Sequence, residues 1–198
     1  MKLNGISKKL SLALALALLV APSANALKVN VTQQQNFTAD QTDKLNQAIT
    51  ILDQVLNSPE FKEKVLNFSY QGQLGFVQNN GMNNQQIYDY LMGGAEMYPT
   101  QQPANGMADM MLSIYTPPWY KRFSKALAYT NIDDPFLHIY KNYYNSATVA
   151  DISNTLVHEW THKMGFDHDF NATPQRPYSV PYGIGNMVED LVAAQTNQ

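Results

Sequence analysis

The chain of 198 residues contains no cysteine. Disulfide bonds, zinc sites with thiolate ligands, cysteine nucleophiles and a lipid-modified N-terminal cysteine are therefore excluded. Charged residues are also scarce, at 15%, and the net charge is −3. A protein that binds nucleic acid is expected to present a basic face, which this charge balance argues against. Aromatic residues reach 11%, with 12 tyrosines, so the composition is typical of a folded chain rather than a disordered one.

The sequence also lacks an apolar run long enough to cross a membrane. The longest run, residues 10–21, follows three lysines and precedes the small residues of Ala24-Asn25-Ala26. Its length of about 12 residues is too short for a hydrocarbon core of ~30 Å, which argues against a transmembrane anchor. The pattern instead predicts a cleavable signal peptide over residues 1–26. We expect residues 27–198 to form one secreted or periplasmic domain with no membrane span and a net charge of −6 after loss of the three lysines.

Hydrophobic periodicity predicts helices in the first half of this domain and strands in the second. A helix is expected over residues 40–56 with Asp40 or Thr42 as its cap, and a second one begins at Ser58-Pro59. The other predicted elements are a helix over residues 87–95 and strands over residues 107–115, 126–130 and 136–144. Helices, then strands, then a further helix indicate an α+β domain with a helix packed against one face of the sheet.

The informative segment is that further helix, which reads His158-Glu159-Trp160-Thr161-His162-Lys163-Met164-Gly165-Phe166-Asp167-His168. Asp151 and Ser153, upstream of it, are natural helix caps. His158 and His162 lie four residues apart, so both imidazoles project from one helix face. That spacing allows two neutral nitrogens to bind one Zn²⁺ at about 2.0–2.1 Å.

Gly165 permits the positive φ that ends a helix, which allows His168 to return as a third ligand. Three protein nitrogens leave the fourth position of a tetrahedral zinc ion open for water, as in a catalytic site. Glu159 stands beside the first histidine and can reach that water without binding the metal. His-Glu-x-x-His alone can arise by chance, but three of the four histidines of the chain fall within these eleven residues.

The pattern His-Glu-x-x-His-x-x-Gly-x-x-His resembles the zinc-binding motif of the metzincin metallopeptidases at all five motif residues. The resemblance implies that His158, His162 and His168 bind zinc and that Glu159 is the general base. It also implies a zincin-like α+β fold, in which a small mixed sheet and N-terminal helices surround the active-site helix and an edge strand pairs with an extended peptide substrate. The strict match covers only about 11 residues of the mature chain.

Metzincins also carry a methionine in a tight turn beneath the metal, often with a tyrosine two residues later. Here Met187 lacks those flanking residues, while residues 180–182 have the tyrosine without the methionine, so either segment is a candidate for the floor of the site. Tyr182 and Tyr178 are candidates for a phenol that binds the oxyanion or a fifth metal position. The alternative for each tyrosine is a half-buried packing role.

Three further residues near these motifs have competing interpretations. His138 lies in a predicted strand, where a structural role is expected rather than metal binding. Asp167 and Asp169 flank His168, and either one orients a ligand from the outer shell or both belong to a solvated loop.

These observations favour an exported, monomeric, zinc-dependent endopeptidase acting on a protein or peptide. One alternative is a non-catalytic or latent secreted zinc-binding domain with a recognition role, although such a domain would usually lose the base that Glu159 supplies. A second alternative is a secreted adhesin or solute-binding module in which the motif is incidental. Metal chelation separates this last class from the other two.

Overall fold

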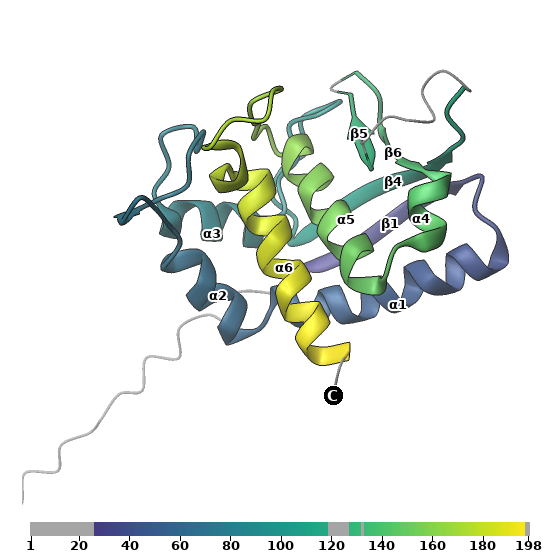
Figure 1. The fold of residues 1–198 in the computed structure, drawn as a ribbon, viewed down its shortest axis with the longest axis horizontal. Coiled ribbons are helices and arrows are strands. Elements are labelled where there is room, and N and C mark those ends of the chain that lie inside the picture. Colours follow the sequence, from purple (N-terminus) through teal and green to yellow (C-terminus); the bar gives the residue numbers. More distant parts are fainter. Residues whose placement is uncertain (1–25, 119–126, 132, 197–198) are drawn as a thin grey trace, which may run out of the picture.

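The protein is represented by a computed structural model that describes residues 26–118, 127–131 and 133–196 (Figure 1). The predicted signal peptide lies outside these ranges except for Ala26. The described part is a mixed α+β domain, as the sequence predicts. In chain order its elements are β1 (Lys28–Gln35), α1 (Ala39–Leu56), α2 (Pro59–Leu66), β2 (Ser69–Tyr70), β3 (Gln73–Leu74), α3 (Asn84–Gly93), β4 (Met107–Tyr115), β5 (Ala128–Thr130), β6 (Phe136–Tyr140), α4 (Lys141–Ser146), α5 (Val149–Lys163), the short 3₁₀ helix η2 (Arg176–Tyr178) and α6 (Val180–Thr196).

Four strands form the main sheet, in the order β1-β4-β6-β5. β1, β4 and β6 run parallel, whereas β5 pairs antiparallel with β6 and forms one edge of the sheet within the described ranges. Alternate residues of β4 are buried, namely Ala108, Met110, Leu112 and Ile114. Because successive side chains of a strand point to opposite faces, this alternation shows that one face of the sheet carries the core.

Helix α5 lies in front of the sheet, and α6 packs alongside it (Figure 1). Leu156, Val157 and Trp160 of α5 have no exposed surface. Full burial of each such side chain contributes about 1.5–3 kcal/mol, so α5 is held firmly by the core. None of the helices within the described ranges has the length and apolar content needed to span a membrane.

Two helix starts differ from the predicted ones for the same reason. Thr38, not Asp40 or Thr42, caps α1, and Thr148, not Asp151 or Ser153, caps α5. In each case the threonine hydroxyl accepts a bond from the backbone three residues later, and the side chain at that position bonds back to the threonine N–H. This reciprocal pair satisfies two free helix donors, whereas a lone cap satisfies one. The predicted start at Ser58 with Pro59 in the first turn of α2 is confirmed.

Other elements also have boundaries that differ from the predicted ones. The strand predicted over residues 136–144 ends at Tyr140, where α4 begins, because Tyr144 turns inward and its hydroxyl donates to the Gln41 carbonyl at 3.0 Å. The helix predicted from Ile87 begins at Asn84 and ends before Gly94, whose φ is 61°. β1 was not predicted, and the alternating Val29 and Val31 are its only clear signal.

Candidate metal centre

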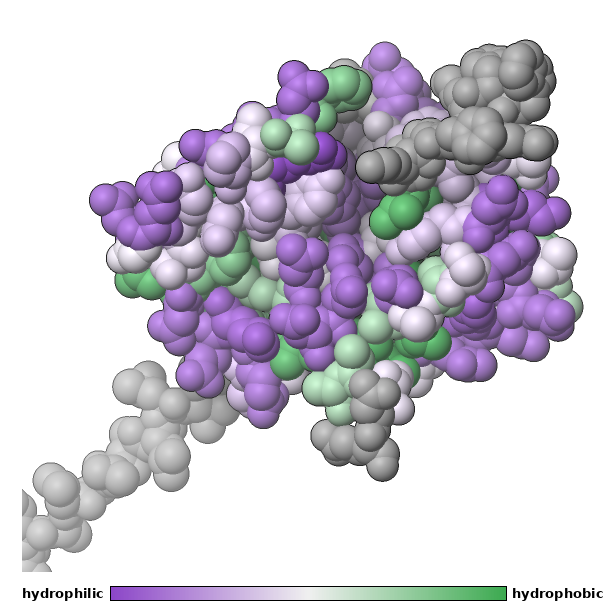
Figure 2. Space-filling view, in the orientation of Figure 1, coloured by the Kyte–Doolittle hydropathy of each residue, from purple (hydrophilic) through white to green (hydrophobic). Residues whose placement is uncertain are grey.

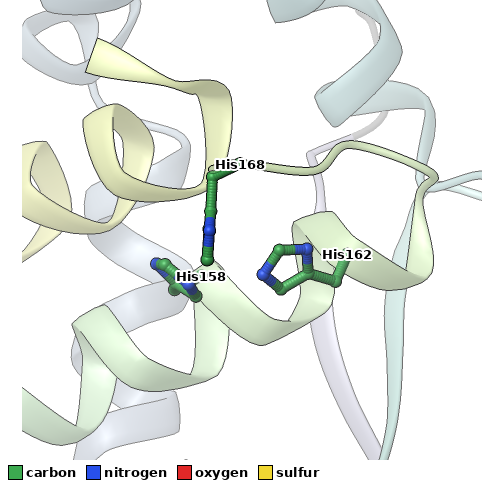
Figure 3. Close-up of side chains that lie close together, drawn as sticks. All are labelled: His158, His162 and His168. Carbon is green, nitrogen blue, oxygen red and sulfur yellow. The ribbon is translucent and has the colours of Figure 1, made fainter. Parts of the chain in front are cut away.

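Three histidines converge at the end of α5. His158 and His162 project from the helix, and His168 reaches back to them from the loop that follows (Figure 3). One ring nitrogen of each histidine lies within 4.8 Å of the corresponding nitrogens of the other two. Small ring rotations bring nitrogens at this spacing onto one metal ion with bonds of about 2.0–2.1 Å. The three histidines picked out in the sequence therefore form a cluster that could hold a metal ion.

The turn after α5 brings His168 to this point. Gly165 has a φ of 92°, and its N–H donates to the His162 carbonyl at 3.0 Å while the Phe166 N–H donates to the Thr161 carbonyl at 3.1 Å. This pair of bonds ends the helix and reverses the chain, as the sequence predicts for a glycine here. A side chain at position 165 would also strike Met97, whose Sδ would lie 2.5 Å from an added Cβ.

Backbone carbonyls orient the three rings. The Nδ1 atom of His162 donates to the Phe166 carbonyl at 2.8 Å, and that of His168 donates to the Asp169 carbonyl at 3.1 Å. The His158 ring bonds to Pro181, which has only a carbonyl to offer. Since a carbonyl can only accept, each ring nitrogen at these bonds carries the proton, and the other nitrogen of each ring is left free for a metal.

The carboxylates of Asp167 and Asp169 do not perform this orienting role. The Asp167 Oδ1 atom accepts from the His168 backbone N–H at 2.7 Å and lies 4.0 Å from the His162 Nδ1 atom. The Asp169 carboxylate accepts instead from Gln78 and Thr173. Both aspartates thus shape the loop, and only the backbone of Asp169 reaches a histidine ring.

Burial keeps the histidines in the form that binds metal. Burial, followed by the charges of His162 and His168, lowers the pKa of His158 to about 3. Burial also lowers the pKa of His162. Both rings are therefore neutral near pH 7, and a metal ion does not have to displace a proton from them.

Glu159 lies in the same cleft and is almost completely buried, with 7% of its surface exposed. Burial raises the pKa of its carboxyl to about 7, against the opposing effects of the Thr130 hydroxyl and of the positive charge of Lys163. A carboxyl whose pKa is near neutrality can accept and release a proton at ordinary pH, which is what a general acid–base catalyst requires.

A cleft of about 1200 Å³ opens over the three histidines. Its floor is α5, β5 lines one wall, and loop residues such as Tyr98 and Phe170 line the rest. Figure 2 shows the surface hollowed near the upper end of α5, within a face that is mainly hydrophilic. The exposed Phe170 ring and the half-exposed Leu127 give this cleft apolar edges.

The structure separates the two candidate tyrosines. The Tyr182 ring lies at the histidine cluster, with its centroid 4.6 Å from that of His158 and 4.8 Å from that of His168. Tyr178 packs instead against Tyr70 at 4.8 Å and does not line the cleft. Met187 is buried within α6, so the first turn of that helix, and not a tight methionine turn, lies beside the histidines.

His138 has the structural role that the sequence predicts. Its Nε2 atom lies 2.9 Å from the Asp134 carboxylate, and its ring stacks on Tyr129 at 4.8 Å. It belongs to the sheet and takes no part in the cluster of three histidines.

Three residues at or beside the cleft were missed by sequence reasoning. Thr130 lines the cleft from β5, Arg176 stands against Tyr182, and Lys163 is buried in α5. Thr130 and Arg176 lie outside the histidine motif, and no spacing rule connects them to it. Lys163 is inside the motif, and its position next to a predicted ligand was the one available signal.

Comparisons with protein-family models, with curated proteins and with solved structures found no match to this chain.

Proposed function

We propose that this protein is an exported, zinc-dependent endopeptidase that acts as a monomer on protein or peptide substrates. The observation that carries the proposal is the meeting of three histidines and a buried glutamate in one open cleft. Three nitrogen donors and one open position make up a donor set typical of catalytic zinc. The residue pattern of the metzincin motif supports the same choice of metal.

Zinc bound by the three histidines would polarise the scissile carbonyl and lower the pKa of a water molecule bound to it. Glu159 takes a proton from the attacking water as the carbon–oxygen bond forms. It then gives that proton to the leaving nitrogen as the carbon–nitrogen bond breaks, so the carboxylate is regenerated after each turnover. The near-neutral pKa of Glu159 suits both transfers.

The sheet offers a means of holding an extended substrate. β5 lies along the cleft, and β6 occupies only one of its two sides within the described ranges. A peptide lying in the cleft can pair its main chain with the other side of β5, which would place a peptide bond over the histidines.

A non-catalytic or latent zinc-binding domain is the second candidate. The retention of Glu159, buried yet facing the cleft, favours catalysis, because a pure binding role gives no reason to bury a carboxyl there. Desolvation of a buried carboxyl costs free energy, and that cost is typical of a residue kept for chemistry.

The test compares the purified wild-type protein with Glu159→Gln and with the control Glu63→Gln, which removes an exposed carboxylate of α2. Zinc content and cleavage of unfolded casein are measured for all three. We expect equal zinc in each protein, full activity in the control, and a loss of about 10²–10⁴-fold in Glu159→Gln. Chelation should abolish the wild-type activity. Zinc in all three proteins without any cleavage would favour the binding domain.

A further inference from the structure

We propose that Arg176 is the anion-binding residue of this site, and that its guanidinium donates hydrogen bonds to a negatively charged oxygen of the substrate beside the three histidines. This inference rests on the proposed function, since it assigns a role within the same cleft. It concerns a residue that lies eight positions beyond the histidine motif.

Arg176 stands one aromatic ring away from the metal centre. Its Cζ atom lies 4.9 Å from the centroid of the Tyr182 ring, and that ring is in turn packed against His158 and His168. A guanidinium over an aromatic face is attracted electrostatically to the electron-rich face of the ring. Tyr182 is thus a platform that holds the charge of Arg176 at the edge of the cleft.

Most N–H groups of the guanidinium have no hydrogen-bond partner among the described residues. Of its five N–H groups, one on Nη1 donates to the Phe170 carbonyl at 3.3 Å, while the buried Nε atom has no partner within the described ranges. A buried donor without a partner is unfavourable, and a bound acceptor would remove that penalty. No carboxylate of the described residues lies within 4.0 Å of the guanidinium, so its charge is not neutralised by an ion pair.

The loop fixes the backbone of Arg176 on both sides. Its N–H donates to the backbone carbonyl of Thr173 at 3.2 Å and to the Thr173 hydroxyl at the same distance, and its carbonyl accepts from the buried Ser179 hydroxyl at 2.8 Å. Thr173 in turn donates to the carboxylate of Asp169, whose carbonyl orients His168. One loop therefore positions both the third histidine and Arg176, and donors fixed in advance are the kind that stabilise developing charge most effectively.

The cleft contains no competing cation within the described ranges. Arg176 is the only lysine or arginine among the residues that line it, and one aromatic ring separates it from His158 and His168. A guanidinium suits an oxyanion or carboxylate better than the Tyr182 phenol does, because its hydrogen bonds are assisted by charge.

Two parts of a peptide substrate can supply the anionic oxygen, namely the oxyanion that develops at the scissile carbonyl or a free C-terminal carboxylate. Arg176→Gln is compared with Lys64→Gln, which removes an exposed charge from α2, and with Arg176→Lys as a rescue variant. One peptide sequence is assayed as the free acid and as the C-terminal amide.

For the oxyanion, we expect Arg176→Gln to lower kcat by about 10²–10³-fold on both peptides. For the carboxylate, we expect a rise in KM that is confined to the free acid. In either case Arg176→Lys recovers part of the loss, while zinc content and Tm stay at their wild-type values. Activity equal to that of Lys64→Gln on both peptides would overturn the inference, as would a larger loss in Tyr182→Phe than in Arg176→Gln.

A binding measurement tests the inference without cleavage. Inorganic phosphate is titrated into the cobalt-loaded protein and followed by the visible spectrum of Co²⁺. We expect Arg176→Gln to raise the Kd for phosphate at least about tenfold, as for loss of a hydrogen bond to a charged group, and Lys64→Gln to leave it unchanged. Equal affinities in the two variants, or no saturable phosphate binding by the wild type, would contradict the role of Arg176. If the protein shows no peptidase activity but binds phosphate in a way that depends on Arg176, the role of Arg176 is supported and the proposed function is contradicted.

Discussion

The Nε1 atom of Trp160 donates a buried hydrogen bond of 2.7 Å to the Oε1 atom of Glu96. The same oxygen accepts from the backbone N–H of Asp109 at 3.0 Å. Trp160 lies on α5 between two of the histidines, and Asp109 lies in β4. The Glu96 carboxyl therefore links the helix of the site and the sheet to the loop that leads to Tyr98 in the cleft. The other oxygen of Glu96 has no partner within the described ranges.

Glu96 should make the stability of the protein depend on pH. Burial, opposed by the bonds from Trp160 and Asp109, raises the pKa of this carboxyl. A raised pKa in the folded state means that folding is favoured when Glu96 is protonated. This contribution is fully present below the unfolded pKa of about 4.3 and is lost as the pH rises through the folded pKa.

We therefore expect the wild type to lose stability relative to Glu96→Gln as the pH is raised from about 4 towards 7. Glutamine keeps an acceptor for Trp160 and carries no charge at any pH. Urea denaturation of both proteins at several pH values gives the difference in unfolding free energy. A difference that does not change with pH would contradict the raised pKa of Glu96, and a change in the opposite direction would show that its pKa is lowered in the fold.

Gly94 should be far less tolerant of a side chain than Gly81, another glycine with positive φ. It ends α3 with a φ of 61°, and an added Cβ would lie 2.6 Å from the backbone nitrogen of Met107. Gly81 has a similar φ of 78° but no atom within 4 Å of the added Cβ. Both alanine variants pay a left-handed backbone cost of about 1–2 kcal/mol, and only Gly94→Ala adds a clash of about 1–3 kcal/mol. Equal unfolding free energies for Gly94→Ala and Gly81→Ala would contradict this close approach.

Lys163 holds the β5–β6 connection onto the site helix. Its buried Nζ atom donates to the Asn131 carbonyl at 3.2 Å and to the Asp134 carbonyl, while its own carbonyl accepts from Met97 and Tyr98. Lys163→Met keeps the apolar stem but removes the ammonium donor from both carbonyls, of which that of Asn131 still accepts from the Asp134 N–H. We expect a loss of about 1–3 kcal/mol in unfolding free energy and reduced casein cleavage with zinc retained.

The matched control for this change is Lys64→Met, on the exposed surface of α2, which should stay within about 0.5 kcal/mol of the wild type. Thermal or urea denaturation measures the stability, and metal analysis shows whether the histidine cluster survives. If Lys163→Met matched the control in both stability and activity, the buried ammonium would have no part in positioning β5.

The site could be predicted from the sequence because its chemistry is local. His158, Glu159 and His162 lie within one helical segment, and Gly165 determines the turn that returns His168, so eleven consecutive residues specify the cluster. Helix and strand types were likewise predicted where apolar residues repeat over many positions, as in α1 and β4.

The element boundaries and cleft residues that the sequence did not predict depend on contacts between distant parts of the chain. Tyr144 lies in α4 and not in an extension of β6 because its hydroxyl meets Gln41, 103 positions earlier. Thr130 enters the cleft that holds Glu159 only because β5 packs on α5, and Arg176 reaches Tyr182 only because a network of hydrogen bonds closes its loop. Local propensity and spacing contain no information on such pairs, and tertiary packing overrides them at element boundaries.

The most direct test of the account is the zinc content of the folded, purified protein and of two histidine variants. His168→Ala removes one member of the cluster, whereas His138→Ala removes the histidine that bonds Asp134 and stays in the sheet. Metal is measured by atomic emission after equilibration with zinc and removal of the excess, and circular dichroism checks that each protein is folded.

We predict one zinc ion per chain in the wild type and in His138→Ala, and a fall to about one-tenth of that in His168→Ala, because two nitrogens alone hold zinc weakly. A wild-type protein that is folded but binds no zinc, or a His168→Ala variant that binds as much zinc as the wild type, would contradict the three-histidine centre.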